Sequence, residues 1–388
     1  MEYRKDQISI LGFGCMRFPK KGGSVDLEET ERQIAYAIEN GVNYFDTAYI
    51  YPGIEKALGT ILEKNGWRSQ VKIATKMPHF LIKSVDGLEK LFQEQLSRLK
   101  TDYVDYYLMH MLPDVHIWNK LVKLGVEDWL LEKKQKGQIH RIGFSYHGNT
   151  ERFLMLLDAW DWDFCQVQYN YMDEYSQAGR PGVTHAAKKG IPVIIMEPLR
   201  GGRLVYGLPP KARRLFEEAK PSRSAAEWGL RWLWNQPEVS VVLSGMNSME
   251  MVQENIRIAK SVRAGELTSK DEDLFYQVKK AVNEKIKVPC TGCGYCQPCP
   301  AGVDIPGIFR CYNVRYTDGW FTGMREYFMC TTLRAERSNA SLCMKCGKCE
   351  SHCPQNISIQ KELSEAAKHM ETPIYKLASL AVRRMYKK

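Results

Sequence analysis

Short apolar runs alternate along the chain with longer stretches whose apolar residues recur three and four positions apart. The short runs predict β-strands, and the longer stretches, such as 27–40 and 84–99, predict amphipathic helices. Gly41 and Gly190 each precede a predicted strand, where the preceding helix needs a C-terminal cap. The predicted strands are 9–14, 42–46, 71–76, 104–110, 141–145, 164–169, 192–196 and 239–244. Eight strand–helix repeats with no additional strands between them predict a closed parallel α/β barrel, the (β/α)8 TIM barrel, rather than an open sheet.

A change of composition divides the chain. Cys15 and Cys165 stand alone, whereas the other ten of the twelve cysteines fall between 290 and 353. A length of 388 residues suits a barrel with an additional small domain. We therefore expect a barrel over 1–285, a small mainly helical domain over 286–370 and a basic C-terminal tail over 371–388.

Two segments are longer than a minimal strand–helix repeat requires. They cover 111–137 and 200–224, and the second combines Gly, Pro and several Arg. Connections of this length are often functional or mobile. The second segment could close over a ligand, and it could equally be a long surface connection.

Composition and charge narrow the class of protein. With 44% hydrophobic and 26% charged residues, the chain is typical of a soluble globular protein. Its formal charge of +10 invites a nucleic-acid interpretation, but Lys and Arg are scattered except in 374–388, so we expect no nucleic-acid partner. We find neither a signal peptide at the N-terminus nor an apolar run long enough for a transmembrane span, and we expect a cytoplasmic protein.

Ionisable residues stand where predicted strands stop. Asp46, Lys76 and His110 each close an apolar run, and Tyr51 follows in the turn after Asp46. Active sites of parallel barrels lie at the C-terminal ends of the strands. Taken singly, the acid could be a turn residue, the phenol a surface aromatic and the imidazole a core histidine. Together, at strand ends, they predict a site for proton transfer.

In these same segments the chain resembles the aldo/keto reductase family. The matching motifs occur in family order and spacing: LGFGCMRFP at 11–19, GVNYFDTAYIY at 41–51, KIATK at 72–76, DYYLMH at 105–110, IGFS at 142–145 and SGMNSMEMVQEN at 244–255. They are spread through about the first 285 residues. The resemblance implies a catalytic tetrad of Asp46, Tyr51, Lys76 and His110.

The side chains suggest what each tetrad member would do. Tyr51 would protonate the carbonyl oxygen of a substrate, although a free phenol titrates near pH 10. Lys76 would stabilise the phenolate and lower that pKa, while Asp46 holds the ammonium in place. His110 would hydrogen-bond the carbonyl and orient it.

The resemblance also implies NAD(P)H across the barrel mouth. Ser145 and Gln166 would hold the nicotinamide amide, and Glu254 and Asn255 would lie near the adenine. Other expected contacts are Gly14, Cys15, Met16, Met196, Leu199, Arg200, Gly201, Ser244, Gly245 and Met246.

Three positions depart from the family pattern. Gly245 and Met251 stand where basic residues often bind the 2′-phosphate of NADP, so NADP and NAD both remain candidate cofactors. Met196 stands where an aromatic residue often stacks on the nicotinamide, which leaves a flavin as an alternative cofactor.

The cysteine-rich segment carries two cluster motifs. Residues 343–354 read CMKCGKCESHCP, the C-x2-C-x2-C-x3-C-P run of bacterial ferredoxins, and 290–300 read CTGCGYCQPCP, one residue shorter before the fourth cysteine. In such pairs the fourth cysteine of each run ligates the other cluster. We therefore expect two [4Fe–4S] clusters, with the first bound by Cys290, Cys293, Cys296 and Cys353 and the second by Cys343, Cys346, Cys349 and Cys299.

Zinc is the competing metal, but structural zinc favours two separated pairs of ligands. Disulfides are less expected still in a cytosolic chain. Cys311 and Cys330 lie between the runs at no ligand spacing, so we predict that they are core residues. The helical spacer resembles that of two-cluster ferredoxin-like modules fused to redox enzymes.

The sequence thus predicts an oxidoreductase that reduces a carbonyl, or oxidises an alcohol, with clusters for electron transfer. Because hydride carries two electrons and a cluster passes one, an alternative is a cluster-fed electron-transfer protein whose barrel holds a flavin or a partner. A third hypothesis is that the clusters only stabilise the fold and transfer no electrons. The basic end of the tail could dock an acidic electron carrier or an anionic membrane surface, or could simply be solvated.

Overall fold

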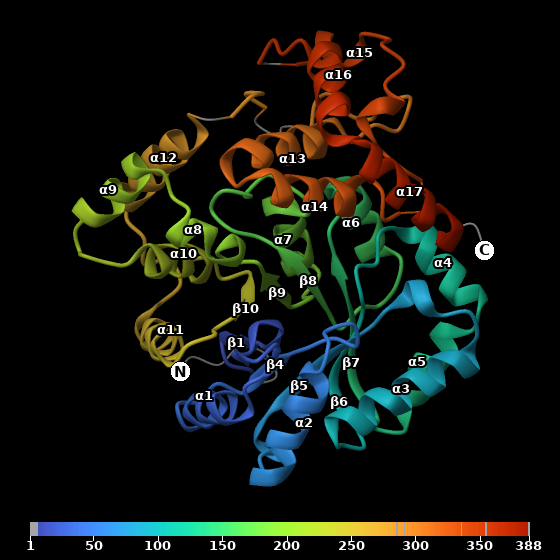
Figure 1. Cartoon of the computed structure of the whole chain (residues 1–388), viewed down its shortest axis with the longest axis vertical. Helices are drawn as coiled ribbons and strands as arrows, with labels where there is room; N and C mark the ends of the chain where they lie inside the picture. The colour runs from blue at the N-terminus through green and yellow to red at the C-terminus, as the bar shows by residue number, and fades with distance from the viewer. Residues whose placement is uncertain are drawn as a thin grey trace.

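The computed structural model describes residues 7–284, 286–290, 292, 294–334, 336–353 and 355–386, and of 382–386 it describes the backbone alone. A closed barrel of parallel strands, in the order β1-β10-β9-β8-β7-β6-β5-β4, forms its centre (Figure 1). The strands are β1 (Leu11–Gly14), β4 (Tyr44–Asp46), β5 (Lys72–Met77), β6 (Val104–Met109), β7 (Ile139–Tyr146), β8 (Phe164–Gln168), β9 (Val193–Met196) and β10 (Val239–Ser244). The predicted TIM barrel is confirmed, and each predicted run overlaps one strand.

Helices follow the strands and surround the barrel. Asp26 and Ser84 cap the first turns of the two helices expected from apolar spacing, and Gly41 and Gly190 have positive φ just past helix ends. The helices of this region are α1 (Leu27–Glu39), α2 (Ile54–Asn65), α3 (Val85–Leu99), α4 (Val115–Lys123), α5 (Val126–Gln135), α6 (Thr150–Asp158), α7 (Gly179–Lys188), α8 (Arg203–Tyr206), α9 (Pro210–Glu218), α10 (Ala225–Trp234), α11 (Met249–Ser261) and α12 (Ser269–Asn283). A small hairpin of β2 (Lys20–Lys21) and β3 (Ser24–Val25) follows β1.

Both long segments singled out in the sequence contain helices. The segment 111–137 forms α4 and α5, whereas 200–224 forms a 3-10 turn, Arg200–Gly202, followed by α8 and α9. Helix α9 packs against α12 and α10. The second segment is therefore a packed part of the wall, consistent with a surface connection.

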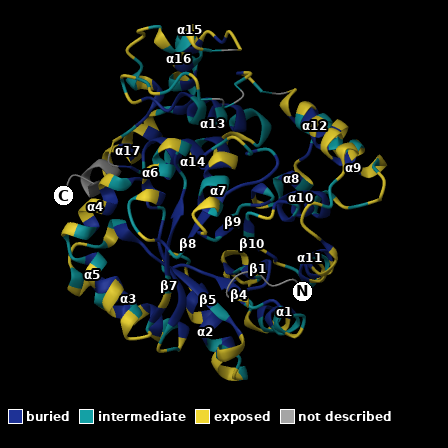
Figure 2. Cartoon of the chain, turned by 180° about the vertical axis from the view of Figure 1, so that it is seen from behind, coloured by how far each residue is buried: buried dark blue, intermediate teal, exposed yellow. Residues whose placement is uncertain are grey.

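The core of the barrel has two parts. Side chains such as Tyr44, Tyr106 and Phe164 fill the interior of the strands, and a larger apolar layer lies between the strands and the surrounding helices. Figure 2 shows the strands buried at the centre and exposed residues concentrated on the outer helices. Such a filled interior leaves the strand ends as the place for a binding site.

A second helical region lies over the barrel at the ends of β8 and β9 (Figure 1). Its helices are α13 (Ile305–Thr317), α14 (Trp320–Thr331), α15 (Lys348–Ser351), α16 (Ile359–Met370) and α17 (Pro373–Tyr386), and it has an apolar core of its own. Helices α13 and α14 form a hairpin and contact each other extensively. No helix among the described residues is long and apolar enough to cross a membrane.

Buried ion pairs join this helical region to the barrel. Asp173, in the loop after β8, binds Arg200 through both carboxylate oxygens, with distances of 2.9 and 2.6 Å. Arg200 also reaches Asp318 at the end of α13, at 3.4 Å. Arg310 of α13 lies 3.5 Å from Asp173 and 2.5 Å from Glu326 of α14. We call these five residues the interface network.

Candidate functional site

The four predicted catalytic residues come together at the C-terminal ends of neighbouring strands. Asp46 ends β4, Lys76 lies near the end of β5, and His110 follows the last residue of β6. Tyr51 lies in the turn between β4 and α2. Since β4, β5 and β6 are adjacent in the barrel, their ends bring the three strand residues to one part of the rim.

A buried ion pair lies at the base of this group. Lys76 Nζ donates hydrogen bonds to Asp46 Oδ1 at 2.6 Å and to the carbonyl oxygen of Thr47 at 2.7 Å. It lies 5.4 Å from the centre of the Tyr51 ring, and that ring meets the His110 ring edge-on at 6.1 Å between centroids. The phenol, the ammonium and the imidazole are thus close enough to act on one substrate group.

The pKa values of Lys76 and Tyr51 are both raised, whereas the sequence predicted a lowered pKa for the tyrosine. Burial alone lowers the pKa of Lys76, but Asp46 and Tyr51 raise it above its usual range, so the ammonium stays charged. Burial raises the pKa of Tyr51, and the opposing charge of Lys76 is the weaker effect. The predicted lowering of the tyrosine pKa is therefore not found: Lys76 acts in that direction but does not outweigh desolvation.

Among the described residues, the buried polar atoms near the ion pair that have no hydrogen-bond partner include Nδ1 of His110 and Oε1 of Gln166. Nε2 of Gln166 donates to Asp46 Oδ2 at 3.1 Å. Burial, and then the charge of Lys76, hold the pKa of His110 well below its usual range, so the ring is neutral at physiological pH. An unpartnered buried polar atom costs about 1–3 kcal/mol, which a ligand that supplies the missing partner would recover.

Several of the expected cofactor residues are already engaged within the protein. Ser145 Oγ accepts from the Met111 amide at 2.8 Å, and Asn255 Nδ2 donates to Ser244 Oγ at 2.9 Å. Glu254 accepts a hydrogen bond from Ser224 at 2.6 Å. These contacts fix the side chains at the barrel rim, and a cofactor would have to share or displace them.

The remaining expected contacts differ in accessibility. Cys15 and Met246 are completely buried, whereas Met16 is 57% exposed. Met196 is half-buried and packs against the barrel interior. Arg200 is buried and bound to Asp173 and Asp318, so its charge is already paired. The other residues of this set, Gly14, Leu199, Gly201 and Gly245, lie in or just after β1, β9 and β10.

Arg17 lies across the loops after β9 and β10, outside the set of contacts expected from the sequence. A Cβ atom added at Gly201 would lie 2.5 Å from Arg17 Nη2, and one added at Gly245 would lie 2.7 Å from Arg17 Cδ. Both glycines therefore leave room for this side chain. The cofactor contacts expected from the sequence ended at Met16. The basic residue directly after Met16 was the signal that could have added Arg17 to them.

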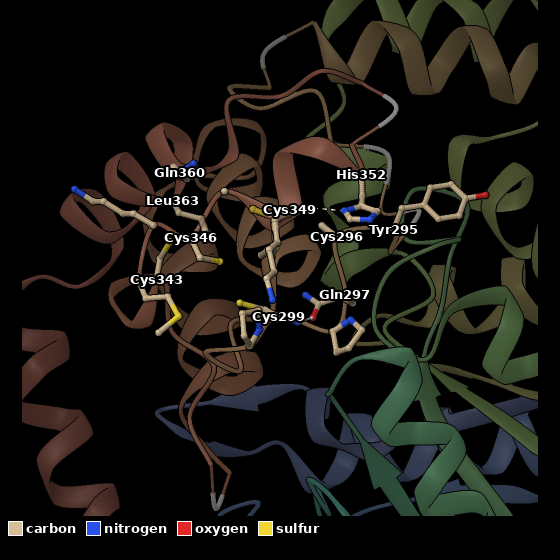
Figure 3. Close-up of a pocket in the computed structure, with 17 residues that line it drawn as sticks. Tyr295, Cys296, Gln297, Cys299, Cys343, Cys346, Cys349, His352, Gln360 and Leu363 are labelled. Carbon is tan, nitrogen blue, oxygen red and sulfur yellow. Dashed lines mark hydrogen bonds between the residues drawn. The ribbon is translucent and has the colours of Figure 1, made fainter.

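The cysteines gather around two cavities in the helical region. One, of about 210 Å³, is lined by Cys299 together with Cys343, Cys346 and Cys349, and also by Cys296 (Figure 3). The other, of about 20 Å³, is lined by Cys290, Cys296 and Cys353. Cys299 thus lies with the first three cysteines of the second run, and Cys353 lies with Cys290 and Cys296 of the first. Cys293 lies outside the described residues.

Among the described residues, no three His, Cys, Asp or Glu side chains are close enough to hold a single metal ion. The thiols instead surround cavities, as the ligands of a cubane do, since each thiolate binds a different iron at a separate corner. The four thiols around the larger cavity therefore fit a [4Fe–4S] cluster, and the smaller cavity shows the thiols of Cys290, Cys296 and Cys353 side by side.

Family models match both parts of the chain. The model described as "Aldo/keto reductase family" matches residues 10–271, and the one described as "4Fe-4S dicluster domain" matches residues 289–358. Together they cover the barrel and the cysteine-rich region.

Individual relatives match the barrel part. An uncharacterized oxidoreductase, YqkF of Bacillus subtilis, is 24% identical over 67% of this chain and 90% of its own length. L-galactose dehydrogenase of Arabidopsis thaliana is 26% identical over 72% of this chain and 92% of its own.

Solved structures show the same fold. The holo form of the aldo-keto reductase AKR11C1 from Bacillus halodurans superposes with a TM-score of 0.58, at 24% identity over 71% of this chain and 93% of its own. An aldo-keto reductase from Klebsiella pneumoniae in complex with NADPH superposes with a TM-score of 0.55, at 22% identity and the same coverage.

Proposed function

The chain belongs to the aldo/keto reductase family, and from this premise we propose that it transfers hydride between NAD(P)H and a small carbonyl or alcohol, with two [4Fe–4S] clusters for electron transfer. The observation that carries the proposal is the buried Lys76–Asp46 pair directly beneath Tyr51 and His110. A proton donor, a fixed positive charge and a neutral imidazole are what reduction of a carbonyl requires of a protein.

Each side chain has a defined part in this chemistry. When bound, NAD(P)H supplies the hydride. The Tyr51 phenol gives its proton to the substrate oxygen, and the charge of Lys76 stabilises the phenolate that is left. Asp46 keeps the ammonium in position, and the neutral His110 ring orients the substrate oxygen.

Replacement of the phenol tests this assignment. In Tyr51→Phe we expect carbonyl reduction to fall by about 10²- to 10⁴-fold, the usual contribution of a positioned acid. The matched control is Tyr49→Phe, because Tyr49 directs its hydroxyl to Glu94 at 2.9 Å, away from the tetrad. Equal activity in wild type and Tyr51→Phe, measured with a panel of aldehydes, would remove the tetrad from the mechanism.

The residues present fit a nicotinamide dinucleotide in part. Oε1 of Gln166, buried and unpartnered, could accept a hydrogen bond from the carboxamide, and Arg17 could contact the phosphates. The paired charge of Arg200 offers no comparable contact. Gly245 and Met251 offer no charge to a 2′-phosphate, so NADP and NAD remain alternative cofactors.

The two cysteine groupings support one cluster at Cys290, Cys293, Cys296 and Cys353 and another at Cys343, Cys346, Cys349 and Cys299. The cavity grouping is the supporting observation. Iron and sulfide analysis of anaerobically purified protein should give about eight of each per chain, as two cubanes require. About four of each would contradict the proposal of two clusters.

One observation favours the alternative of an electron-transfer protein that binds a flavin or partner. A cavity of about 1030 Å³ lies between the barrel and the helical region, lined by residues of both, including Tyr171 and Arg200 of the barrel and Arg310 of α13. A cavity of this size is at the upper end for small-molecule sites. Extraction of a flavin from the purified protein, with no hydride transfer to any aldehyde, would favour this second function.

A further inference from the structure

Two cysteines outside the cluster motifs converge on one nitrogen atom. Cys311 lies on α13 and Cys330 near the end of α14, and both are buried. Nη2 of Arg310 lies 3.7 Å from the sulfur of Cys311 and 3.5 Å from that of Cys330. The packing of the α13–α14 hairpin thus brings together two thiols that are 19 residues apart in the chain.

The pKa values of the two thiols respond to more than burial, unlike that of an ordinary core cysteine. Cys165 is also completely buried, and burial alone raises its pKa. The hydrogen bond from Cys311, and next the charge of Arg310, lower the pKa of Cys330, whereas the same hydrogen bond and burial raise that of Cys311. One sulfur of the pair is therefore suited to be the thiolate and the other to hold the proton, which is the division needed for attack of one thiol on another.

The surroundings give the pair access to both parts of the molecule. Cys330 and Arg310 line the cavity of about 1030 Å³, whose wall also includes Cys290 of the first cluster motif and Arg200 of the barrel. Arg310 is held in place by Glu326 and Asp173. The cavity between the cysteine-rich region and the barrel therefore has a fixed guanidinium and a pair of thiols at its wall.

We propose that Cys311 and Cys330 form a redox-active dithiol that closes reversibly to a disulfide at the wall of this cavity. On oxidation the Cys330 thiolate and the Cys311 thiol form one S–S bond, one S–H bond breaks, one proton passes to water in the cavity, and two electrons leave. Resting on the proposed function, the electrons pass one at a time to the two [4Fe–4S] clusters, and reduction reverses the step. Such a couple would store the two electrons that clusters exchange singly and hydride carries as a pair.

The chain offers a direct assay, because trypsin places each sulfur in its own short peptide. These are residues 311–315 and 326–334, each with a single cysteine. Anaerobic holoprotein is equilibrated with buffers of reduced and oxidised dithiothreitol, quenched in acid to stop thiol exchange, alkylated and digested. We expect the two peptides to be joined by a disulfide in oxidising buffer and both alkylated in reducing buffer. Their ratio should change tenfold for each tenfold change in the buffer ratio.

Controls separate a specific couple from general oxidation. The Cys165 peptide should stay alkylated as a monomer at every buffer ratio, and Cys330→Ser should leave the 311–315 peptide unlinked. Peptides that stay unlinked in wild-type protein across the whole range, or that link equally to Cys165, would overturn the proposal. Neither result depends on hydride transfer, so the proposed function can fail while the couple is found, and the reverse.

A second measurement tests the path of the electrons. The disulfide form is mixed with a reduced viologen, a one-electron donor, and its opening is followed by the same peptide assay. We expect opening at least tenfold slower in Cys346→Ser, which alters a proposed cluster ligand, with the dithiothreitol equilibrium unchanged. An equal rate in both proteins would exclude the clusters as the electron source.

Discussion

Two buried polar groups, the tetrad and the interface network, each contain a carboxylate paired with a cation, and they differ in how completely their polar atoms are paired. Asp173 of the network accepts hydrogen bonds from Arg200, Asn170 and Gln168, which engage both its oxygens. In and beside the tetrad, Nδ1 of His110 and Oε1 of Gln166 have no hydrogen-bond partner within the described part of the chain.

This difference in hydrogen-bond pairing distinguishes an interface between two parts of the molecule from a site that can bind a ligand. Although burial opposes it, the charges of Arg200 and Arg310 hold the pKa of Asp173 below its usual range, so Asp173 stays ionised between the two guanidinium groups. The tetrad keeps a charged lysine but leaves neighbouring polar atoms open to a ligand. Closed networks hold the two parts of the molecule together, whereas the open one is available for chemistry.

Removal of the tetrad cation should give the largest effect. In Lys76→Met, Asp46 keeps a buried charge without its partner, so we expect a loss of about 3–5 kcal/mol in the free energy of unfolding. Aldehyde reduction should fall by about 10³-fold or more, within the range of lost acid–base and electrostatic assistance. Urea unfolding and single-turnover kinetics measure the two effects.

The control is Lys64→Met, which removes the exposed partner of Glu31 and should cost less than about 1 kcal/mol. Unchanged turnover in Lys76→Met would mean that the tetrad is a structural ion pair like those of the network.

Breaking the ion pairs of the interface network should lower the free energy of unfolding more than it lowers the rate of carbonyl reduction. In Asp173→Asn, Arg200 and Arg310 lose a shared buried carboxylate, and we expect about 3–5 kcal/mol of lost stability. The single-turnover rate of the folded variant should change little. Asp158→Asn removes an exposed carboxylate from Lys189 and is the matched control, expected within about 1 kcal/mol. Asp173→Asn as stable as wild type would show that the network does not hold the helical region to the barrel.

Arg17 should contribute to cofactor affinity alone. In Arg17→Met we expect dinucleotide binding to weaken about 10- to 100-fold, since a hydrogen bond to a charged group is worth about 1.5–3 kcal/mol. Fluorescence titration with NADPH and NADH measures the change. Lys20→Met, an exposed change nearby in β2, should bind as wild type does. Equal affinities in all three proteins would remove Arg17 from the cofactor site.

The smallest expected effect is the pH response of carbonyl reduction. The active phenol is protonated, and because burial raises the pKa of Tyr51, that form persists through the usual tyrosine range. Lys76 also stays charged there, since Asp46 and Tyr51 raise its pKa, and His110 stays neutral. Single-turnover rates should be flat from about pH 6 to 9 and should fall only above about pH 10. A fall centred near pH 7 would contradict this description of the tetrad.

The barrel and the tetrad were predictable because both depend on local pattern. Apolar runs of strand length fix where each strand stops, and parallel strands bring Asp46, Lys76 and His110 to the same rim. The order of the motifs then identified the family. Spacing within the two cysteine runs predicted the iron–sulfur region that the family model matches over residues 289–358, and the swapped ligand assignment stays a prediction.

What escaped prediction depends on partners far apart in sequence or on burial. The pairing of Arg200 with Asp318 spans 118 residues, so the sequence placed Arg200 among the cofactor contacts instead. The thiols Cys311 and Cys330 meet only because two helices pack as a hairpin. The direction of the Tyr51 pKa reflects a balance between desolvation and the charge of Lys76, and sequence supplies no measure of desolvation.

The fate of the transferred hydrogen tests the central claim most directly. Holoprotein is mixed anaerobically with NADPH or NADH carrying deuterium at both C4 positions and with a panel of aldehydes, and the alcohols are examined by mass spectrometry. The account predicts alcohol with one deuterium on the former carbonyl carbon, formed by wild type and by Tyr49→Phe and greatly reduced in Tyr51→Phe. Alcohol without deuterium, or none at all while the clusters are reduced, would contradict it.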